Sequence, residues 1–71
     1  MDKGKIGESA GIVWRTLESK GCLTIEELQE QTKLGMLELF SAIGWLARED
    51  KISFNKENGI TSVRLYQETY Y

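Results

Sequence analysis

Two features of this chain could take part in covalent or metal chemistry: a single cysteine, Cys22, and a cluster of three glutamates. The chain has no histidine, so the thiol lacks the base that usually activates a cysteine nucleophile. One cysteine also cannot form an internal disulfide. Because free cysteine is among the most buried residue types, we expect Cys22 to be a small buried residue at the start of a short strand.

The glutamate cluster, Glu26, Glu27 and Glu30, offers oxygen ligands without the geometry of a metal site. Neighbouring residues on a helix point in different directions, and acidic residues in a first helical turn complement the helix dipole. A lone cysteine and the missing histidine also exclude an ordinary zinc site. With no nucleophile–base pair either, the sequence indicates no enzyme, no cofactor, no metal and no small-molecule substrate.

The distribution of charge argues against a strongly basic nucleic-acid surface. The net charge is −2. Residues 21–32 carry three acidic groups and no basic one, whereas residues 33–64 carry five basic and four acidic groups. Proteins that bind nucleic acid mainly through phosphates usually show a clearly basic block. Any nucleic-acid contact by this chain therefore depends on a few basic side chains.

Length and composition describe one small folded domain. The chain has 71 residues, 41% hydrophobic and 28% charged, and we expect a single domain over 1–71 with a core at about 6–65 and a tail at 66–71. No apolar run approaches the ~20 residues of a membrane span, no signal peptide is visible, and a lone cysteine fits a reducing compartment. We therefore expect a cytoplasmic protein without membrane contact. A core of this size leaves about 3–5 kcal/mol of net stability, which favours pairing with a second copy.

Periodic apolar residues and a capping motif predict two helices in the first half of the chain. The first helix covers about residues 6–20, and a short strand at residues 22–23 follows it. The second helix opens with a capping box formed by Thr24 and Glu27 and ends near Thr32. The apolar face of the first helix comprises Ile6, Ala10, Val13, Trp14 and Leu17. Trp14 could be a binding residue, but a large aromatic side chain at this spacing is expected in the core.

A third helix is predicted over about residues 36–49, after a tight turn at residues 33–35. Gly35 supplies the conformational freedom that this turn needs. Apolar residues at i, i+3, i+4 and i+7 form the buried face of the helix, which leaves its other half outward. The buried face comprises Leu39, Ala42, Ile43 and Leu46.

A β-hairpin is predicted after the third helix, with Asn58-Gly59 as its two-residue turn. This turn pairs Glu57 with Ile60, Phe54 with Val63, and Ile52 with Leu65. Ile52, Phe54, Val63 and Leu65 then share one sheet face, and Ser53, Asn55, Ser62 and Arg64 share the other. The agreement between turn and register supports the hairpin. The tyrosine-containing tail, residues 66–71, could extend the second strand.

The order of the predicted elements resembles a winged helix-turn-helix, an α+β fold that is mostly α. This order is helix, short strand, short helix, turn, helix and hairpin. The residues that carry the resemblance are Gly21–Leu23, T-I-E-E-L at 24–28, the turn at 33–35, L-x-x-A-I-x-x-L at 39–46 and R-E-D-K-I at 48–52. V-W near the start, combined with A-I-G-W-L-A-R-E-D-K-I, is similar to a family of small bacterial proteins described as winged helix-turn-helix domains of unknown function. That resemblance implies DNA binding, and the first hypothesis is a small transcriptional regulator.

In this first hypothesis the third helix enters a major groove of double-stranded DNA, and the wing lies along a backbone or minor groove. Ser41 could contact a base edge or a phosphate. DNA-reading helices generally present arginine, lysine, asparagine or glutamine, whereas the outward positions here include Leu37 and Gly44. Sequence-specific readout is therefore predicted to be weak. The candidate phosphate contacts are Lys33, Arg48, Lys56 and Arg64.

In a second hypothesis the winged helix is a protein-interaction or dimerisation module. A contiguous exposed apolar patch is unusual on a monomer and usual at an interface, and Gly44 would let a partner helix approach closely. A symmetric homodimer is the simplest version, and it is compatible with DNA binding because many helix-turn-helix proteins bind DNA as dimers. Contact with a larger enzyme such as a polymerase is a third possibility. The patch comprises Met36, Leu37, Phe40, Gly44 and Trp45.

The exposure of Phe40 and Trp45 remains open at this point. Both lie at the edge of the outward arc of the third helix. They could contribute to an interface, or they could pack against the wing and the first helix, as aromatic residues of intermediate burial often do.

Overall fold

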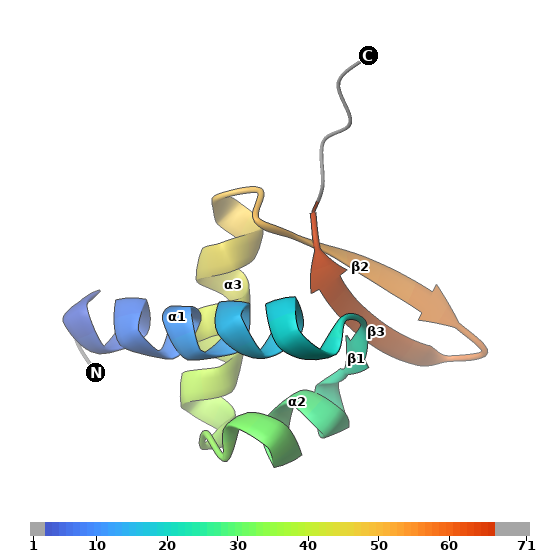
Figure 1. Cartoon of the computed structure of the whole chain (residues 1–71), viewed down its shortest axis with the longest axis horizontal. Helices are drawn as coiled ribbons and strands as arrows, with labels where there is room; N and C mark the ends of the chain where they lie inside the picture. The colour runs from blue at the N-terminus through green and yellow to red at the C-terminus, as the bar shows by residue number, and fades with distance from the viewer. Residues whose placement is uncertain (1–2, 67–71) are drawn as a thin grey trace.

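A computed structural model of the protein describes residues 3–66 (Figure 1). Within this range the chain forms three helices and one three-stranded antiparallel sheet, so the predicted winged-helix architecture is confirmed. α1 crosses in front of α3, α2 lies below α1, and the hairpin projects to the right (Figure 1). The elements are α1 (Lys3–Lys20), β1 (Leu23–Thr24), α2 (Ile25–Thr32), α3 (Met36–Arg48), β2 (Ile52–Glu57) and β3 (Ile60–Leu65). α1 thus begins about one turn earlier than predicted.

The hydrophobic core lies where α1, α3 and the sheet meet. Val13 of α1, Leu39 of α3 and Val63 of β3 are fully buried. The four residues predicted as the inward face of α3 are all buried, and Trp14 is half-buried against the same cluster. The buried hydrophobic residues are Ala10, Val13, Leu17, Leu28, Leu39, Ala42, Ile43, Leu46, Ile52 and Val63.

α2 begins with the capping box that the sequence predicts. The Glu27 amide donates to the Thr24 Oγ1 at 3.1 Å, and the Thr24 amide donates to the Glu27 Oε1 at 2.9 Å. The prediction for Gly35 is wrong, because its φ is −66° and it serves as the N-cap of α3. Lys33 has the left-handed φ of 60° instead. The reason is position, since the left-handed residue that closes a helix must directly follow its last turn, two residues before Gly35.

The sheet has the predicted register. All three predicted cross-strand pairs of the hairpin are present, and the turn residues Asn58 and Gly59 have φ of 52° and 79°, as a type I′ turn requires. β1 lies along the other edge of β3, with Leu23 opposite Val63, which gives the order β1-β3-β2. β3 is therefore the central strand and ties the wing to the helices.

Cys22 is exposed, so the expectation of a buried cysteine is wrong. It directly precedes β1, which comprises Leu23 and Thr24 rather than residues 22–23. Leu23 lies opposite the buried Val63, on the face of the sheet that contacts the helices. Successive residues of an extended chain point to opposite sides, so the residue before Leu23 is turned away from the core.

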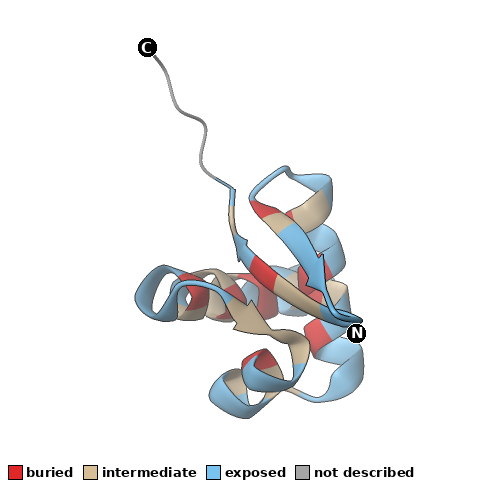
Figure 2. Cartoon of the chain, turned by 90° about the vertical axis from the view of Figure 1, so that its right-hand side faces the viewer, coloured by how far each residue is buried: buried red, intermediate tan, exposed pale blue. Residues whose placement is uncertain are grey.

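The wing extends past the helices that cover its base. Ile52 and Val63 are buried, whereas Phe54, on the same sheet face, is 51% exposed. Figure 2 shows this gradient, with buried segments at the base of the hairpin and exposed segments toward its tip. Past β3, the Tyr66 amide donates to the Lys51 carbonyl at 2.8 Å. The remaining residues of the predicted tail, 67–71, lie outside the described residues.

Candidate nucleic-acid and partner interfaces

α3 presents one uncovered face next to the wing. Its first turn is anchored by the Leu39 amide, which donates to the Gly35 carbonyl at 2.9 Å. The buried residues of α3 recur every three or four positions, so the opposite half of the helix faces solvent. Leu37, Gly44 and Arg48 on that half are exposed, and Ser41 between them is half-buried. This outward face is the part of α3 available to a partner.

The four basic residues predicted to contact phosphates are all exposed, but the structure does not gather them into one patch. Lys33 and Arg48 lie at opposite ends of α3, about 20 Å apart along the helix axis. Lys56 lies near the wing tip, on the sheet face turned toward the helices. Arg64 lies on the other sheet face, where its Nε donates to the Ser53 Oγ at 3.4 Å. Arg64 is thus separated from the other three.

The apolar patch predicted on α3 is divided into two parts. Phe40 and Trp45 are five residues apart, which places them about 140° apart around the helix. Trp45 lies on the flank that faces α1, where it lines a cavity together with Trp14 and is 38% exposed. The other part, which we call the α3 apolar patch, comprises Met36, Leu37 and Phe40, with exposures of 53%, 71% and 51%. Both aromatic side chains are therefore exposed, and Trp45 alone lies against α1.

Phe54 is an exposed aromatic residue that sequence reasoning assigned to the covered sheet face. Its cross-strand partner Val63 is buried, so the assignment of the face itself is correct. Phe54 lies only four residues before Asn58 in the hairpin turn, and the hairpin projects past the helices toward that turn (Figure 1). Closeness to the turn was the signal in the sequence that could have indicated its exposure.

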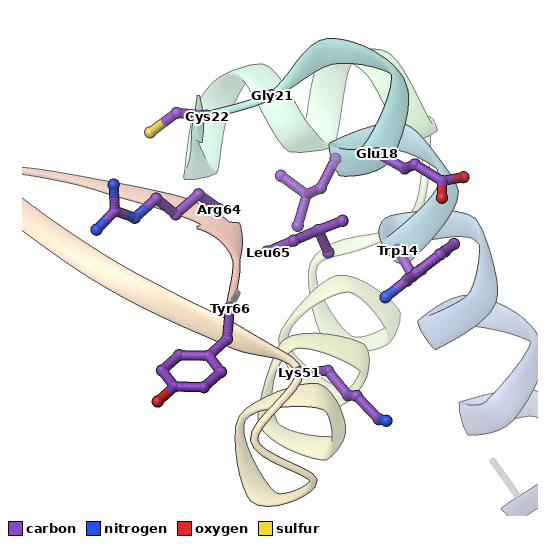
Figure 3. Close-up of a pocket in the computed structure, with 9 residues that line it drawn as sticks. Trp14, Glu18, Gly21, Cys22, Lys51, Arg64, Leu65 and Tyr66 are labelled. Carbon is purple, nitrogen blue, oxygen red and sulfur yellow. The ribbon is translucent and has the colours of Figure 1, made fainter. Parts of the chain in front are cut away.

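A groove runs along α1 and contains two adjoining cavities of 640 and 540 Å³. Both cavities are lined by Trp14, Glu18 and Lys51, so they form one continuous depression, which we call the α1–α3 groove. In the close-up of the larger cavity, Leu65 lies at its centre and the Cys22 sulfur points away from it (Figure 3). The smaller cavity is further lined by Ala10, Gly11, Arg15, Trp45, Leu46 and Glu49.

The described part of the chain shows no arrangement typical of a metal or disulfide site. No group of three histidine, cysteine, aspartate or glutamate side chains within residues 3–66 could hold a metal ion. Cys22 is a free thiol. In the same range no helix is both long enough and apolar enough to cross a membrane.

Three comparisons relate the chain to known proteins. A family model described as "Winged helix-turn-helix domain (DUF2582)" matches residues 1–65. The uncharacterized protein MJ1608 of Methanocaldococcus jannaschii is 42% identical to the chain over 57 residues, which cover 78% of this chain and 81% of that protein. The solution NMR structure of protein BT2368 from Bacteroides thetaiotaomicron superimposes with a TM-score of 0.82 at 29% identity, covering 100% of this chain and 95% of that one. The similar proteins thus come from an archaeon and a bacterium.

Proposed function

Because the chain belongs to the winged helix-turn-helix domain family DUF2582, as its sequence resemblance predicted, we propose that it binds double-stranded DNA as a homodimeric transcriptional regulator. The outward face of α3 and the wing are the contact surfaces in this proposal. The observation that carries it is the uncovered half of α3, flanked at its two ends by the exposed Lys33 and Arg48. A cytoplasmic location is part of the same proposal, since a free thiol fits a reducing compartment.

The charge of the surface limits the affinity that this proposal allows. Lys33, Arg48 and Lys56 are the basic residues on the side formed by α3 and the wing. Three phosphate contacts in one chain, or about six in a dimer, support salt-sensitive binding of low sequence specificity. The α3 apolar patch offers no hydrogen-bonding groups to base edges, which points the same way.

An amide-shift titration tests DNA binding directly. Uniformly ¹⁵N-labelled protein is mixed at low salt with a random duplex, and the shifts of residues 36–48 are followed. We expect graded shifts at residues 33, 41, 48 and 56, which disappear when salt is added. Unchanged shifts throughout residues 36–48 at millimolar duplex would reject DNA binding by this surface.

A second candidate function is protein interaction through the α3 apolar patch. Met36, Leu37 and Phe40 are each more than half exposed on consecutive turns of one helix, and such patches are typical of interfaces. Phe54 on the neighbouring wing adds an exposed aromatic side chain. In this candidate function the chain is an accessory domain that contacts a larger protein. This candidate function is favoured if the amide shifts of α3 stay unchanged in the duplex titration.

A further inference from the structure

The α1–α3 groove joins cavities of 640 and 540 Å³, and its lining includes aromatic side chains. Both tryptophans of the chain line it: Trp14 lines both cavities and Trp45 lines the smaller one. Buried apolar side chains such as Ala10 and Leu46 form its floor. An aromatic-walled groove with an apolar floor is suited to burying a partner of similar width, such as a helix.

The charges at the rim of the smaller cavity are balanced, whereas Arg64 adds a third positive group to the groove at the larger cavity. Arg15 and Lys51 contribute two positive groups, and Glu18 and Glu49 contribute two negative groups. A surface of one sign would repel its own copy, whereas a balanced surface can be complementary to itself across a two-fold axis. On α1, Arg15 and Glu18 are one turn apart on the exposed side of the helix. The rim of the smaller cavity therefore matches a second copy of this chain.

We propose that α1 of a second copy lies antiparallel in the α1–α3 groove, and that α1 of the first copy lies in the matching groove of the second. This inference names the interface of the homodimer proposed above and rests on that part of the proposed function. Each α1 then contacts both α1 and α3 of the other copy. The two helices cross between residues 16 and 17, within one turn of Trp14, so that Arg15 of each copy lies beside Glu18 of the other.

The glycines of α1 agree with a close helix approach at this place. Gly11 lines the groove, and a Cβ there would contact only the flexible end of Arg15, 3.4 Å away. A Cβ at Gly7 would meet nothing within 4 Å. Glycine inside a helix is destabilising relative to alanine, and packing within one copy does not explain either position. A partner helix that approaches the backbone closely supplies the reason.

The dimensions of α1 are sufficient for such an interface. Its 18 residues make a helix about 27 Å long. A standard interface buries about 800 Å² from each partner, a modest part of the 5304 Å² surface of the chain. The arrangement also leaves the outward face of α3 free, so it is compatible with DNA binding.

Charge reversal tests the pairing across the two-fold axis. Arg15→Glu and Glu18→Arg, made singly, each place like charges opposite one another and should weaken dimerisation about tenfold or more. The double variant R15E/E18R restores opposite charges and should recover the affinity of the unaltered protein. Lys20→Glu is the matched control, since it changes the charge of α1 equally but lies outside the groove lining. A double variant as weak as the singles, with all variants folded by circular dichroism, would overturn the pairing.

Paramagnetic broadening locates the interface independently. Cys22 is the only cysteine of the chain and is exposed, so a nitroxide label attaches at one site without engineering. Nitroxide-labelled protein is mixed with ¹⁵N-labelled protein that carries no nitroxide, at a concentration where sedimentation shows a dimer. An antiparallel crossing between residues 16 and 17 brings the label of one copy close to Gly11 of the other, so we expect broadening centred on residues 8–14.

The outcomes separate this inference from the proposed function. Broadening confined to residues 36–44 in a dimer would overturn the groove interface and leave the homodimer standing. A monomer at hundreds of micromolar would overturn both the groove interface and the homodimer. DNA binding is judged separately by the amide shifts of α3, which do not depend on either result.

Discussion

Phe40 and Trp45 lie on opposite flanks of α3, one facing away from α1 and the other lining the α1–α3 groove with Trp14. Five residues of helix separate them, so no single flat partner can cover both side chains at once. The sequence pattern predicted one apolar patch that contains both residues, but they belong to two separate surfaces of α3. Their roles can be tested one at a time.

The separation of the two aromatic residues predicts different effects on dimerisation. Trp45→Ala should weaken the dimer by tenfold or more, because a tryptophan in a desolvated groove is the kind of residue that dominates interface energetics. Phe40→Ala should leave the dimer dissociation constant within about twofold of the unaltered protein, since Phe40 lies outside the groove. Sedimentation equilibrium on both variants measures this. Loss of the dimer in Phe40→Ala alone would place the interface on the α3 apolar patch instead.

The positions of two arginines predict different effects on DNA binding. Arg48 lies at the end of α3, whereas Arg64 lies on the far face of the wing, where it donates to Ser53. Arg48→Glu should reduce affinity for random duplex and lower the salt slope by about one phosphate equivalent per chain. Arg64→Glu, with the same change of charge, should have a clearly smaller effect. Fluorescence anisotropy in matched salt series distinguishes them, and equal losses would show that only net charge matters.

The number of basic groups beside α3 predicts the salt dependence of the unaltered protein. Three phosphate contacts in each chain correspond to a slope of log affinity against log salt of about −3 for a monomer and about −5 for a dimer. The slope should change between these values with protein concentration if dimerisation and DNA binding occur together. A slope near zero in anisotropy titrations would contradict contacts to the phosphate backbone.

The burial of two leucines on α3 predicts opposite results for stability. Leu39 is fully buried, so Leu39→Ala should lower the free energy of unfolding by about 2–5 kcal/mol, the range seen when a core leucine leaves a cavity. Leu37 is 71% exposed on the same helix, so Leu37→Ala should change it by less than about 0.5 kcal/mol. Urea denaturation followed by tryptophan fluorescence measures both. A large loss in Leu37→Ala would indicate that a partner covers this residue.

The backbone of the turn before α3 predicts a stabilising substitution. Lys33 has a φ of 60°, a conformation that costs an L-residue about 1 kcal/mol and costs glycine little. Lys33→Gly should therefore raise the free energy of unfolding by about 0.5–1 kcal/mol. Gly35→Ala is the comparison and should not stabilise the protein, because the φ of Gly35 is −66° and an added Cβ would lie 3.0 Å from the Glu38 Oε1. A destabilised Lys33→Gly would show that the lysine side chain contributes more than its backbone costs.

The parts of the fold that follow from local chemistry were predictable. Thr24 and Glu27 form a capping box because the two residues need only each other, three positions apart. The Asn58-Gly59 turn set the register of the hairpin, because a two-residue loop leaves one way to pair the strands. The inward face of α3 followed from its period of apolar residues.

The candidate surfaces were predictable only in part. The exposure of Lys33, Arg48 and Lys56 followed from their charge, since unpaired basic side chains stay in water. Arg64 is separated from them because it lies on the other face of the sheet, and the predicted hairpin register had already assigned it to that face. The groove was not predicted, because Trp14 was expected in the core in preference to a binding role and its neighbour Trp45 comes 31 residues later in the chain.

By itself the sequence determined the order of elements, the capped start of α2, the hairpin register and the family, because each depends on residues close together in the chain. Only the tertiary structure decided that Cys22 is exposed, that Phe54 lies past the covered part of the wing, and that Trp45 joins Trp14 in a groove. Those properties depend on where one element ends relative to another. Such distances arise from the packing of α1, α3 and the sheet, and no local pattern of residues contains them.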